Sequence, residues 1–467
     1  MDFLIDVVKQ INDILLNYIL LVLLCGTGIF LTFKLKFIHV RKFGEGFRRI
    51  FGGLNLKGKK ADKDGMSSFQ ALSTAIAAQV GTGNLAGAAT AIASGGPGAI
   101  FWMWLSAFLG MATIYAEAIL SQLFKTRVDG EVTGGPAYYI KNGLKNKKIA
   151  KFLAGFFSIS CILALGFMGN IVQSNSISQA FNNAFGLPTF IAGIIVALLG
   201  GFVFFGGMGR IASVTEKVVP LMAGLYILAS LIIIILNGNQ ILPALKSIVV
   251  GAFNPEAVAG GVIGITIKQA VRYGVARGLF SKEAGMGSTP HAHAVANVKH
   301  PGEQGSVAII SVFIDTFVIL TLTALVILTS GALESGETGI ALTQRAFELS
   351  LGSYGQGFIA ICLLFFAFST IIGWYFFGES NIKYLFGNKG LTPYRILVMV
   401  FVFVGSLLKV DLVWELADTF NALMVMPNLI AVLALSGLVV KSMNDYEKFR
   451  GIDINKTNNF KSYSFIN

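Results

Sequence analysis

The chain has 467 residues, of which 54% are hydrophobic and only 13% are charged. Soluble globular proteins carry roughly 25% charged residues, so this composition excludes a soluble protein and indicates an all-α polytopic membrane protein. Lysine and arginine outnumber aspartate and glutamate by 36 to 24, a formal net charge of +12. The basic residues lie in loops between apolar segments, which is typical of cytoplasmic membrane loops and argues against a nucleic-acid partner. Cys25, Cys161 and Cys362 all lie in apolar segments, so we expect no structural disulfide.

The first apolar segment, residues 15–35, is long enough to span a bilayer, which requires about 20 apolar residues. The loop that follows is rich in lysine and arginine, so we place it in the cytoplasm and the N-terminus outside. Binding of anionic membrane lipid is a second interpretation of this loop.

The next apolar segment, residues 69–92, contains the run Gln79-Val80-Gly81-Thr82-Gly83-Asn84 near its middle. Glycines inside a helix cost about 1 kcal/mol each relative to alanine. Non-helical backbone at membrane depth is tolerated only where it is buried in protein or lines a cavity. We therefore predict a discontinuous helix whose first half ends near Val80 and whose second half begins near Gly83.

The two ends at such a break offer different chemistry. Free carbonyls at the end of the first half suit a small cation, and free N–H groups at the start of the second half suit a carboxylate. Their combination is typical of a sodium-coupled amino-acid transporter. A glycine packing face formed by Gly83 and Gly87 is the alternative, but it leaves Gln79, Thr82 and Asn84 unexplained.

Ten apolar segments after the first bring the predicted total to eleven spans. They cover residues 69–92, 99–124, 152–184, 188–205, 211–236, 259–277, 306–330, 358–385, 394–408 and 412–440. Ten spans divide into two sets of five, and because five is odd the second set must run with inverted topology. We therefore predict an extra N-terminal helix and basic loop (1–65), a first repeat (66–240), a second repeat (241–440) and a polar cytoplasmic tail (441–467). A short interfacial helix is expected between residues 236 and 259.

An inverted repeat also predicts a second interrupted helix at the start of the second set. Gly260, Gly261 and Gly264 precede the run 268–278, which carries Lys268, Gln269 and Arg272 where a lipid-facing helix would not. We place the second interruption in this region.

Five sequence stretches resemble one family of membrane proteins. Residues 95–110 read GGPGAIFWMWLSAFLG, which is closely similar to the signature of the sodium:alanine (alanine or glycine:cation) symporter family. The stretches QVGTGNLAG (79–87), TGGPAYYI (133–140), GVARGLFSKEAGMGS (274–288) and GWYFFGE (373–379) resemble the same family. The resemblance implies a LeuT-type fold with broken first and sixth core helices, and import of a small neutral amino acid driven by Na⁺.

The resemblance also implies a sodium site between the first and eighth core helices. Aligned with that fold, its ligands are the carbonyls of Ala77, Val80 and Phe366 and the hydroxyls of Ser369 and Thr370. All five are neutral oxygens, which suit a hard cation. The alternative is that both hydroxyls bond carbonyls one turn earlier in their own helix.

The substrate is expected at the same break. The N–H groups of Gly81, Gly83 and Asn84 would bind its carboxylate, and the side chains of Gln79, Thr82 and Asn84 would add hydrogen bonds. Facing candidates are Phe167, Asn170 and Gln173 in the third core helix, Gln269 in the sixth and Trp374 in the eighth. Core packing by the aromatic residues and interhelical bonding by the amides are the alternatives.

The sequence is compatible with few competing functions. Asp315 is the deepest acid and could serve a proton relay or a second ion site, and Glu117 is the other carboxylate that proton coupling could use. A larger neutral substrate such as glutamine is compatible with the same framework. No histidine lies in a predicted span, which argues against a membrane enzyme, and His291 and His293 lack further metal ligands at suitable spacing. We expect a monomeric plasma-membrane transporter that binds a neutral amino acid and sodium.

Overall fold

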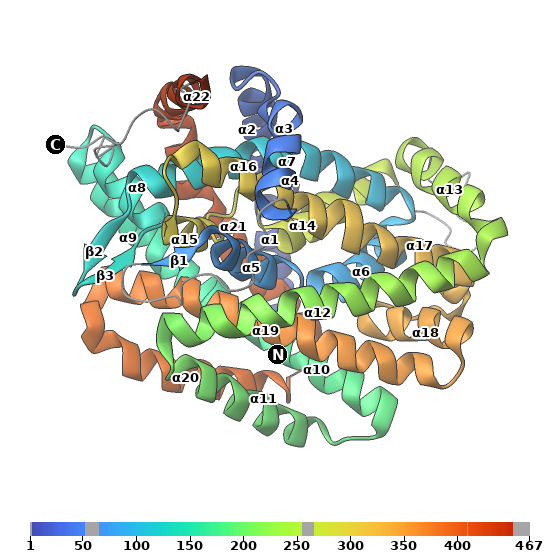
Figure 1. The fold of residues 1–467 in the computed structure, drawn as a ribbon. Coiled ribbons are helices and arrows are strands. Elements are labelled where there is room, and N and C mark those ends of the chain that lie inside the picture. The colour runs from blue at the N-terminus through green and yellow to red at the C-terminus, as the bar shows by residue number, and fades with distance from the viewer. Residues whose placement is uncertain (1, 52–64, 255–265, 409, 452–467) are drawn as a thin grey trace.

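The computed structural model describes residues 2–51, 65–254, 266–408 and 410–451. The chain forms a bundle of helices with two small two-stranded sheets (Figure 1). The N-terminal part contains α1 (Asp2–Ile14), the π-helix η1 (Leu15–Leu20), α2 (Leu21–Lys34), α3 (Ile38–Arg41) and α4 (Phe43–Phe51).

The first half of the core follows. It contains β1 (Met66–Ser67), α5 (Ser68–Gln79), the π-helix η2 (Gly83–Gly87), α6 (Ala88–Gly95), α7 (Gly98–Leu123), β2 (Thr126–Val128), β3 (Glu131–Thr133), α8 (Pro136–Gly143), α9 (Lys147–Cys161), the π-helix η3 (Ile162–Gly169), α10 (Asn170–Phe185), α11 (Thr189–Phe204), α12 (Gly207–Leu236), the 3₁₀ turn η4 (Gly238–Gln240) and α13 (Ile241–Phe253). Helix α13 lies where a short interfacial helix was predicted.

The second half begins at α14. It contains α14 (Ile267–Lys282), α15 (Pro290–Ala294), β4 (Ala296–Asn297), α16 (Pro301–Val312), the π-helix η6 (Phe313–Leu320), α17 (Thr321–Ser330), the 3₁₀ turn η7 (Ala332–Ser335), α18 (Gly339–Leu351), α19 (Tyr354–Phe386), the 3₁₀ turn η8 (Gly387–Gly390), α20 (Leu391–Gly405), α21 (Val410–Ala434) and α22 (Ser436–Gly451). Strand β1 pairs in parallel with β4, with Met66 opposite Ala296, so the start of the first half is joined to the segment that follows α15 in the second half. Strands β2 and β3 form an antiparallel hairpin.

Seven helical segments in the described part of the chain are long and apolar enough to cross a membrane. Four further predicted spans are not found as separate segments, for identifiable reasons. Residues 69–92 are interrupted, α11 has 16 residues, residues 259–277 fall partly outside the described ranges, and α20 is counted with α19 in one segment of 52 residues.

Helices α11 and α20 pack together at one edge of the bundle (Figure 1). Outward side chains on α11 and α12 such as Leu198, Phe202 and Ile235 are more than 60% exposed, which is typical of a lipid-facing surface.

The predicted interruption at residues 80–83 is present. Helix α5 ends at Gln79, Val80 is extended (φ −84°, ψ 92°), and the chain resumes as η2 at Gly83. Helix α5 starts with a capping box, in which the Ser67 hydroxyl accepts from the Gln70 N–H and the Gln70 side chain accepts from the Ser67 N–H.

The second interruption lies later than predicted. Helix α14 continues to Lys282, and the non-helical segment is residues 283–289, before α15. Glu283, Gly285 and Gly287 have φ of +57°, +93° and +79°, a left-handed backbone that ends the helix. The glycines that suggested an earlier break, Gly260, Gly261 and Gly264, lie outside the described residues.

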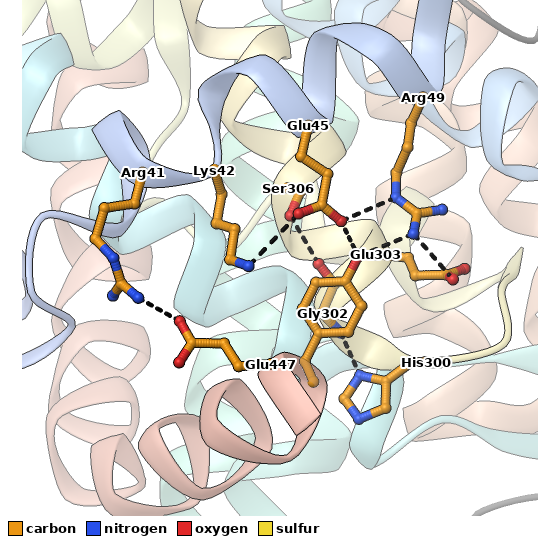
Figure 2. Close-up of polar contacts among 10 residues, drawn as sticks. Arg41, Lys42, Glu45, Arg49, His300, Gly302, Glu303, Ser306 and Glu447 are labelled. Atoms are coloured by element: carbon orange, nitrogen blue, oxygen red, sulfur yellow. Dashed lines mark hydrogen bonds and ion pairs between the residues drawn. The ribbon is translucent and has the colours of Figure 1, made fainter. Parts of the chain in front are cut away.

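The C-terminal region is more ordered than the polar composition after residue 440 suggested, because α22 continues to residue 451. Its Tyr446 is buried, and an added Cβ at Gly302, at the start of α16, would lie 2.4 Å from the tyrosine ring. Figure 2 shows the ion pair beside it, between Arg49 of α4 and Glu303 of α16. The Tyr446 hydroxyl donates to the Glu45 carboxylate and accepts from Arg49 at 2.9 Å, and Arg49 also pairs with Glu303 at 3.1 Å. The ammonium of Lys42 lies 5.3 Å from the Tyr446 ring centroid. Helix α22 is thus attached to both α4 and α16.

We expect Tyr446→Phe to lower the stability of the protein, because it leaves the ring in place but removes the hydroxyl shared by Glu45 and Arg49. Losing a hydrogen bond to a charged group costs about 1.5–3 kcal/mol. The measurement is the thermal unfolding midpoint of the protein purified in detergent. Glu447→Gln is the control, since the side chains of the Arg41–Glu447 pair are 41% and 33% exposed and surface pairs contribute about 0–1 kcal/mol. An equal midpoint for Tyr446→Phe and the wild type would contradict this account.

Candidate functional site

Five oxygen atoms meet where the break in the first half faces α19. The Thr370 hydroxyl lies 2.9 Å from the Ala77 carbonyl oxygen and 3.4 Å from that of Val80. The Ser369 hydroxyl lies 3.4 Å from the Ala77 oxygen and 2.8 Å from the Phe366 oxygen. Thr370 also donates to Phe366 at 3.1 Å, so both hydroxyls bond within their own helix as well as to α5. All five groups proposed as cation ligands are therefore neighbours in the fold.

Close packing holds this cluster together. An added Cβ at Gly81 would lie 2.3 Å from the Thr370 hydroxyl oxygen and 3.0 Å from the Gln173 side-chain oxygen. Only glycine permits this approach of the break to α19 and α10. The Thr82 N–H donates to the Gln173 side-chain oxygen at 3.1 Å, which brings α10 to the break.

Three buried oxygens, two in the break and one in α10 a turn before Gln173, have no hydrogen-bond partner among the described residues. They belong to the side chains of Gln79, Thr82 and Asn170. All three residues are 99% or more buried. Because buried polar atoms in native proteins are nearly always paired, these atoms mark a place where a polar ligand can supply the missing partner.

Asn84 and Asp315 connect the first break to the second half of the chain. The Asn84 side-chain oxygen accepts from the Gly81 N–H at 3.0 Å, and its amide donates to the Asp315 carboxylate at 2.6 Å. The same carboxylate accepts from Ser281 at 2.9 Å and from Thr316 at 2.7 Å. Asp315 is fully buried and holds the end of α14 beside η2.

Direct contacts also join the two breaks. The Gln79 amide donates to the Lys282 carbonyl at 2.7 Å. An added Cβ at Gly83 would lie 2.9 Å from the Ser281 Cα, so the two chains touch at this glycine. The two breaks therefore pack directly against each other, so a ligand bound at one of them can affect the position of the other.

Glu117 of α7 organises the second break. Its carboxylate accepts from the N–H groups of Gly285 and Gly287, both at 3.1 Å, and from the Asn428 amide of α21 at 2.6 Å. Nearby, the Glu283 carboxylate accepts from the Ser288 hydroxyl and from the Trp374 indole N–H. Two buried carboxylates thus fix a non-helical segment against three helices.

The chain was compared with known proteins. The profile of the sodium:alanine symporter family matches residues 1–461. The chain belongs to this family. It is 42% identical over 455 residues to the sodium/alanine symporter AgcS of Methanococcus maripaludis, with 96% of this chain and 98% of AgcS covered. It is 43% identical over 439 residues to the probable sodium/glutamine symporter GlnT of Bacillus subtilis, with 94% of this chain and 89% of GlnT covered.

A third relative is the putative sodium/proton-dependent alanine carrier protein YrbD of Bacillus subtilis, 39% identical over 468 residues, with 96% of this chain and 94% of YrbD covered. Among solved structures, a mutant of the manganese transporter of Eremococcus coleocola is similar in fold. The TM-score is 0.50 at 15% identity, covering 80% of this chain and 78% of that one. Family membership makes this chain a multi-pass membrane transporter rather than an enzyme.

Two residues of the predicted substrate site lie in other surroundings in this symporter. Gln269 is exposed and belongs to a capping box with Thr266, which starts α14 just as Ser67 and Gln70 start α5. Its side chain is used to begin the helix, so it is not among the residues brought together. The Phe167 ring stacks on Phe401 of α20 at 4.6 Å between centroids, which is core packing. Trp374 lies one helical turn after Thr370 and is buried beside Phe280.

Sequence reasoning did not assign Ser281, Lys282, Glu283 or Asn428, all of which contact the breaks. A usable signal existed for Glu283, because a carboxylate next to a glycine-rich run in an apolar region requires a partner. Asn428 had no such signal, since its role depends on where α21 packs.

Proposed function

We propose that this symporter imports a small neutral amino acid, alanine or glycine in either the D or the L form, together with Na⁺ by alternating access. We place it in the plasma membrane as a monomer with an external N-terminus and a cytoplasmic C-terminus. The observation that carries the proposal is the meeting of the Ala77, Val80 and Phe366 carbonyls with the Ser369 and Thr370 hydroxyls.

Sodium is the cation that suits these ligands. Hard cations prefer oxygen ligands, and five neutral oxygens carry partial negative charge without a full carboxylate. The ligands come from two elements, the broken α5 and the continuous α19. An ion bound between them would favour the conformation in which the two are close, and this differential affinity is the source of coupling.

The amino acid would bind beside the three buried oxygens that have no hydrogen-bond partner among the described residues. Its ammonium group offers hydrogen-bond donors to the side-chain oxygens of Gln79, Thr82 and Asn170. Its carboxylate would lie at the start of η2, near the N–H groups of Gly83 and Asn84. The buried Trp374, held by Glu283, limits the space for a side chain and supports a substrate as small as alanine.

The LeuT-type repeat provides the framework for alternating access. Helices α5 and α14 both start with a capping box and both end at a break, as expected for corresponding helices of an inverted repeat. We assign Asp315 to the connection between the breaks rather than to a second ion, because Asn84, Ser281 and Thr316 already occupy its oxygens.

Uptake of radiolabelled alanine into proteoliposomes, with and without an inward Na⁺ gradient, tests this function. We expect uptake only with the gradient, and competition by unlabelled glycine but not by glutamine. Competition by glutamine alone would keep the ion site and overturn the role of Trp374 in limiting size. Uptake that follows the pH gradient and ignores Na⁺ would overturn the sodium proposal.

A further inference from the structure

The Trp374 indole packs against a glycine at the end of the π-helix η3. Trp374 is 1% exposed, and an added Cβ at Gly169 would lie 2.4 Å from its Cζ3 atom and 2.5 Å from its Cε3 atom. Carbon atoms in contact are about 3.5–4.0 Å apart, so a methyl group there cannot coexist with the ring in its present place. The Ala164 carbonyl oxygen, at 2.9 Å, is the next atom that the methyl group would meet. The ring of Trp374 therefore occupies the notch left by the missing side chain of Gly169.

The indole is held on other sides as well. Its N–H, on the edge opposite Cε3 and Cζ3, donates to the Glu283 carboxylate at the second break. The Phe280 ring of α14 lies edge-on to the indole, with 5.3 Å between the ring centroids and 88° between the ring planes. A group placed in the Gly169 notch would therefore push the ring away from η3 and toward the second break.

Both edges of the ring lie next to residues proposed to bind the amino acid. On one edge, Gly169 directly precedes Asn170, whose side-chain oxygen has no partner among the described residues. On the other edge, Glu283 directly follows Lys282, and the Lys282 carbonyl accepts from the Gln79 amide. The Gln79 side-chain oxygen is likewise unpartnered within the described ranges. The indole thus extends from beside Asn170 to beside the segment that Gln79 contacts.

The positions of these residues along α10 and α19 place the contact one turn from the first break. An added Cβ at Gly81 would lie close to both the Thr370 hydroxyl oxygen and the Gln173 side-chain oxygen, so α19 and α10 meet there. Trp374 follows Thr370 by four residues, which is about one helical turn. Gly169 precedes Gln173 by four residues, about one turn in the other direction. The ring and the glycine therefore meet one turn further along the same two helices, as one boundary of the proposed substrate site.

We propose that Gly169 is the residue that sets the size limit of the amino-acid site, because its missing side chain decides how far the Trp374 ring extends toward the substrate. The inference rests on the proposed import of a small neutral amino acid and adds the residue that determines which sizes are accepted. With the notch empty, the ring withdraws far enough to admit the methyl group of alanine. A side chain in the notch pushes the ring toward the breaks, which leaves room for glycine as a substrate but not for alanine.

The test compares sodium-dependent uptake of radiolabelled alanine and glycine by the full-length protein in proteoliposomes. We expect Gly169→Ala to lower the ratio of kcat/KM for alanine to that for glycine at least about tenfold, since one methylene in an apolar pocket changes selectivity about 10–200-fold. Gly201→Ala is the matched control, because Gly201 lies in α11 and its added Cβ would meet the flexible end of Met399. That control should leave the ratio unchanged.

A double variant with Trp374→Phe makes the test specific to this contact. Phenylalanine lacks the second ring of the indole, so the notch can be filled without displacing it. In the Trp374→Phe background we therefore expect Gly169→Ala to change the ratio less than about twofold, which is within the scatter of double-mutant cycles. Comparison within that background cancels the loss of the bond to Glu283, which Trp374→Phe causes by itself.

The possible results separate the proposal from its alternatives. An unchanged or increased ratio in Gly169→Ala would overturn it, as would an equal fall of the ratio in the Trp374→Phe background. Loss of folded protein or of all uptake in both Gly169→Ala and the double variant would show that the glycine serves the backbone near Ala164, and would also overturn it. Absence of sodium-dependent uptake of both amino acids by the wild type would instead overturn the proposed function.

Discussion

The double substitution Ser369→Ala and Thr370→Val should abolish sodium-dependent uptake. It removes two of the five oxygens that meet at the first break and leaves the carbonyls of Ala77, Val80 and Phe366 in place. Each lost interaction with a charged group costs about 1.5–3 kcal/mol, so both together should raise the sodium concentration for half-maximal uptake by at least about 100-fold.

The measurement is initial alanine uptake in proteoliposomes over a range of external Na⁺. Ser380→Ala is the matched control, because Ser380 is a buried serine of the same helix whose hydroxyl donates to the Phe376 carbonyl one turn earlier, at 3.1 Å. It should leave the sodium dependence unchanged. Normal sodium dependence in the double variant would remove the proposed ion site.

Glu117→Gln should lower alanine uptake at least tenfold and raise the KM for alanine. The carboxylate of Glu117 accepts three hydrogen bonds at the second break, from Gly285, Gly287 and Asn428. A glutamine has one oxygen, so its amide would face at least one of these donors, and losing a charge-assisted bond costs about 1.5–3 kcal/mol. The segment that carries Glu283 and holds Trp374 would then lose its shape.

Uptake kinetics and the thermal unfolding midpoint in detergent check this prediction. Glu379→Gln is the control, since Glu379 is a buried acid of α19 whose partners, Lys383 at 3.0 Å, Arg395 and Tyr375, belong to neither break. We expect that control to change stability but not the KM for alanine. If Glu117→Gln left both the KM and the midpoint at their wild-type values, the carboxylate would not position the break.

The sodium ligands illustrate what a resemblance combined with local chemistry can predict. Ala77 and Val80 follow from aligning the break after Val80 with the break of the fold that the chain resembles, and Ser369 and Thr370 are the adjacent hydroxyl pair in the helix that corresponds to its eighth core helix. In the structure the Thr370 hydroxyl lies within 3.4 Å of all three carbonyl oxygens, and the Ser369 hydroxyl within 3.4 Å of those of Ala77 and Phe366. Sodium binding there is a proposal, whereas the convergence of these groups is a property of the fold.

The substrate residues were harder to predict. Two glutamines of the predicted site lie at opposite ends of their helices. Gln269 forms the capping box that starts α14, and Gln79 is the last residue of α5, beside the first break. A polar residue in an apolar segment requires a partner, but its sequence position does not say whether that partner is a ligand or the helix's own backbone. Phe167 presented the same ambiguity, since an aromatic ring can line a site or pack on a neighbouring helix, as it does on Phe401.

By itself the sequence determined the class of this protein, its helical segments and the position of the first break. These follow from local properties: apolar length, charge distribution, and the cost of glycine inside a helix. Only the tertiary structure decided the position of the second break, the connection of Asn84 to Asp315, and the burial of Lys282 beside Ser106. These depend on which helices pack together across more than 170 residues of chain, as for Lys282 and Ser106. Hydrophobic periodicity is the same for a helix whichever neighbour it packs against, and so does not specify those pairings.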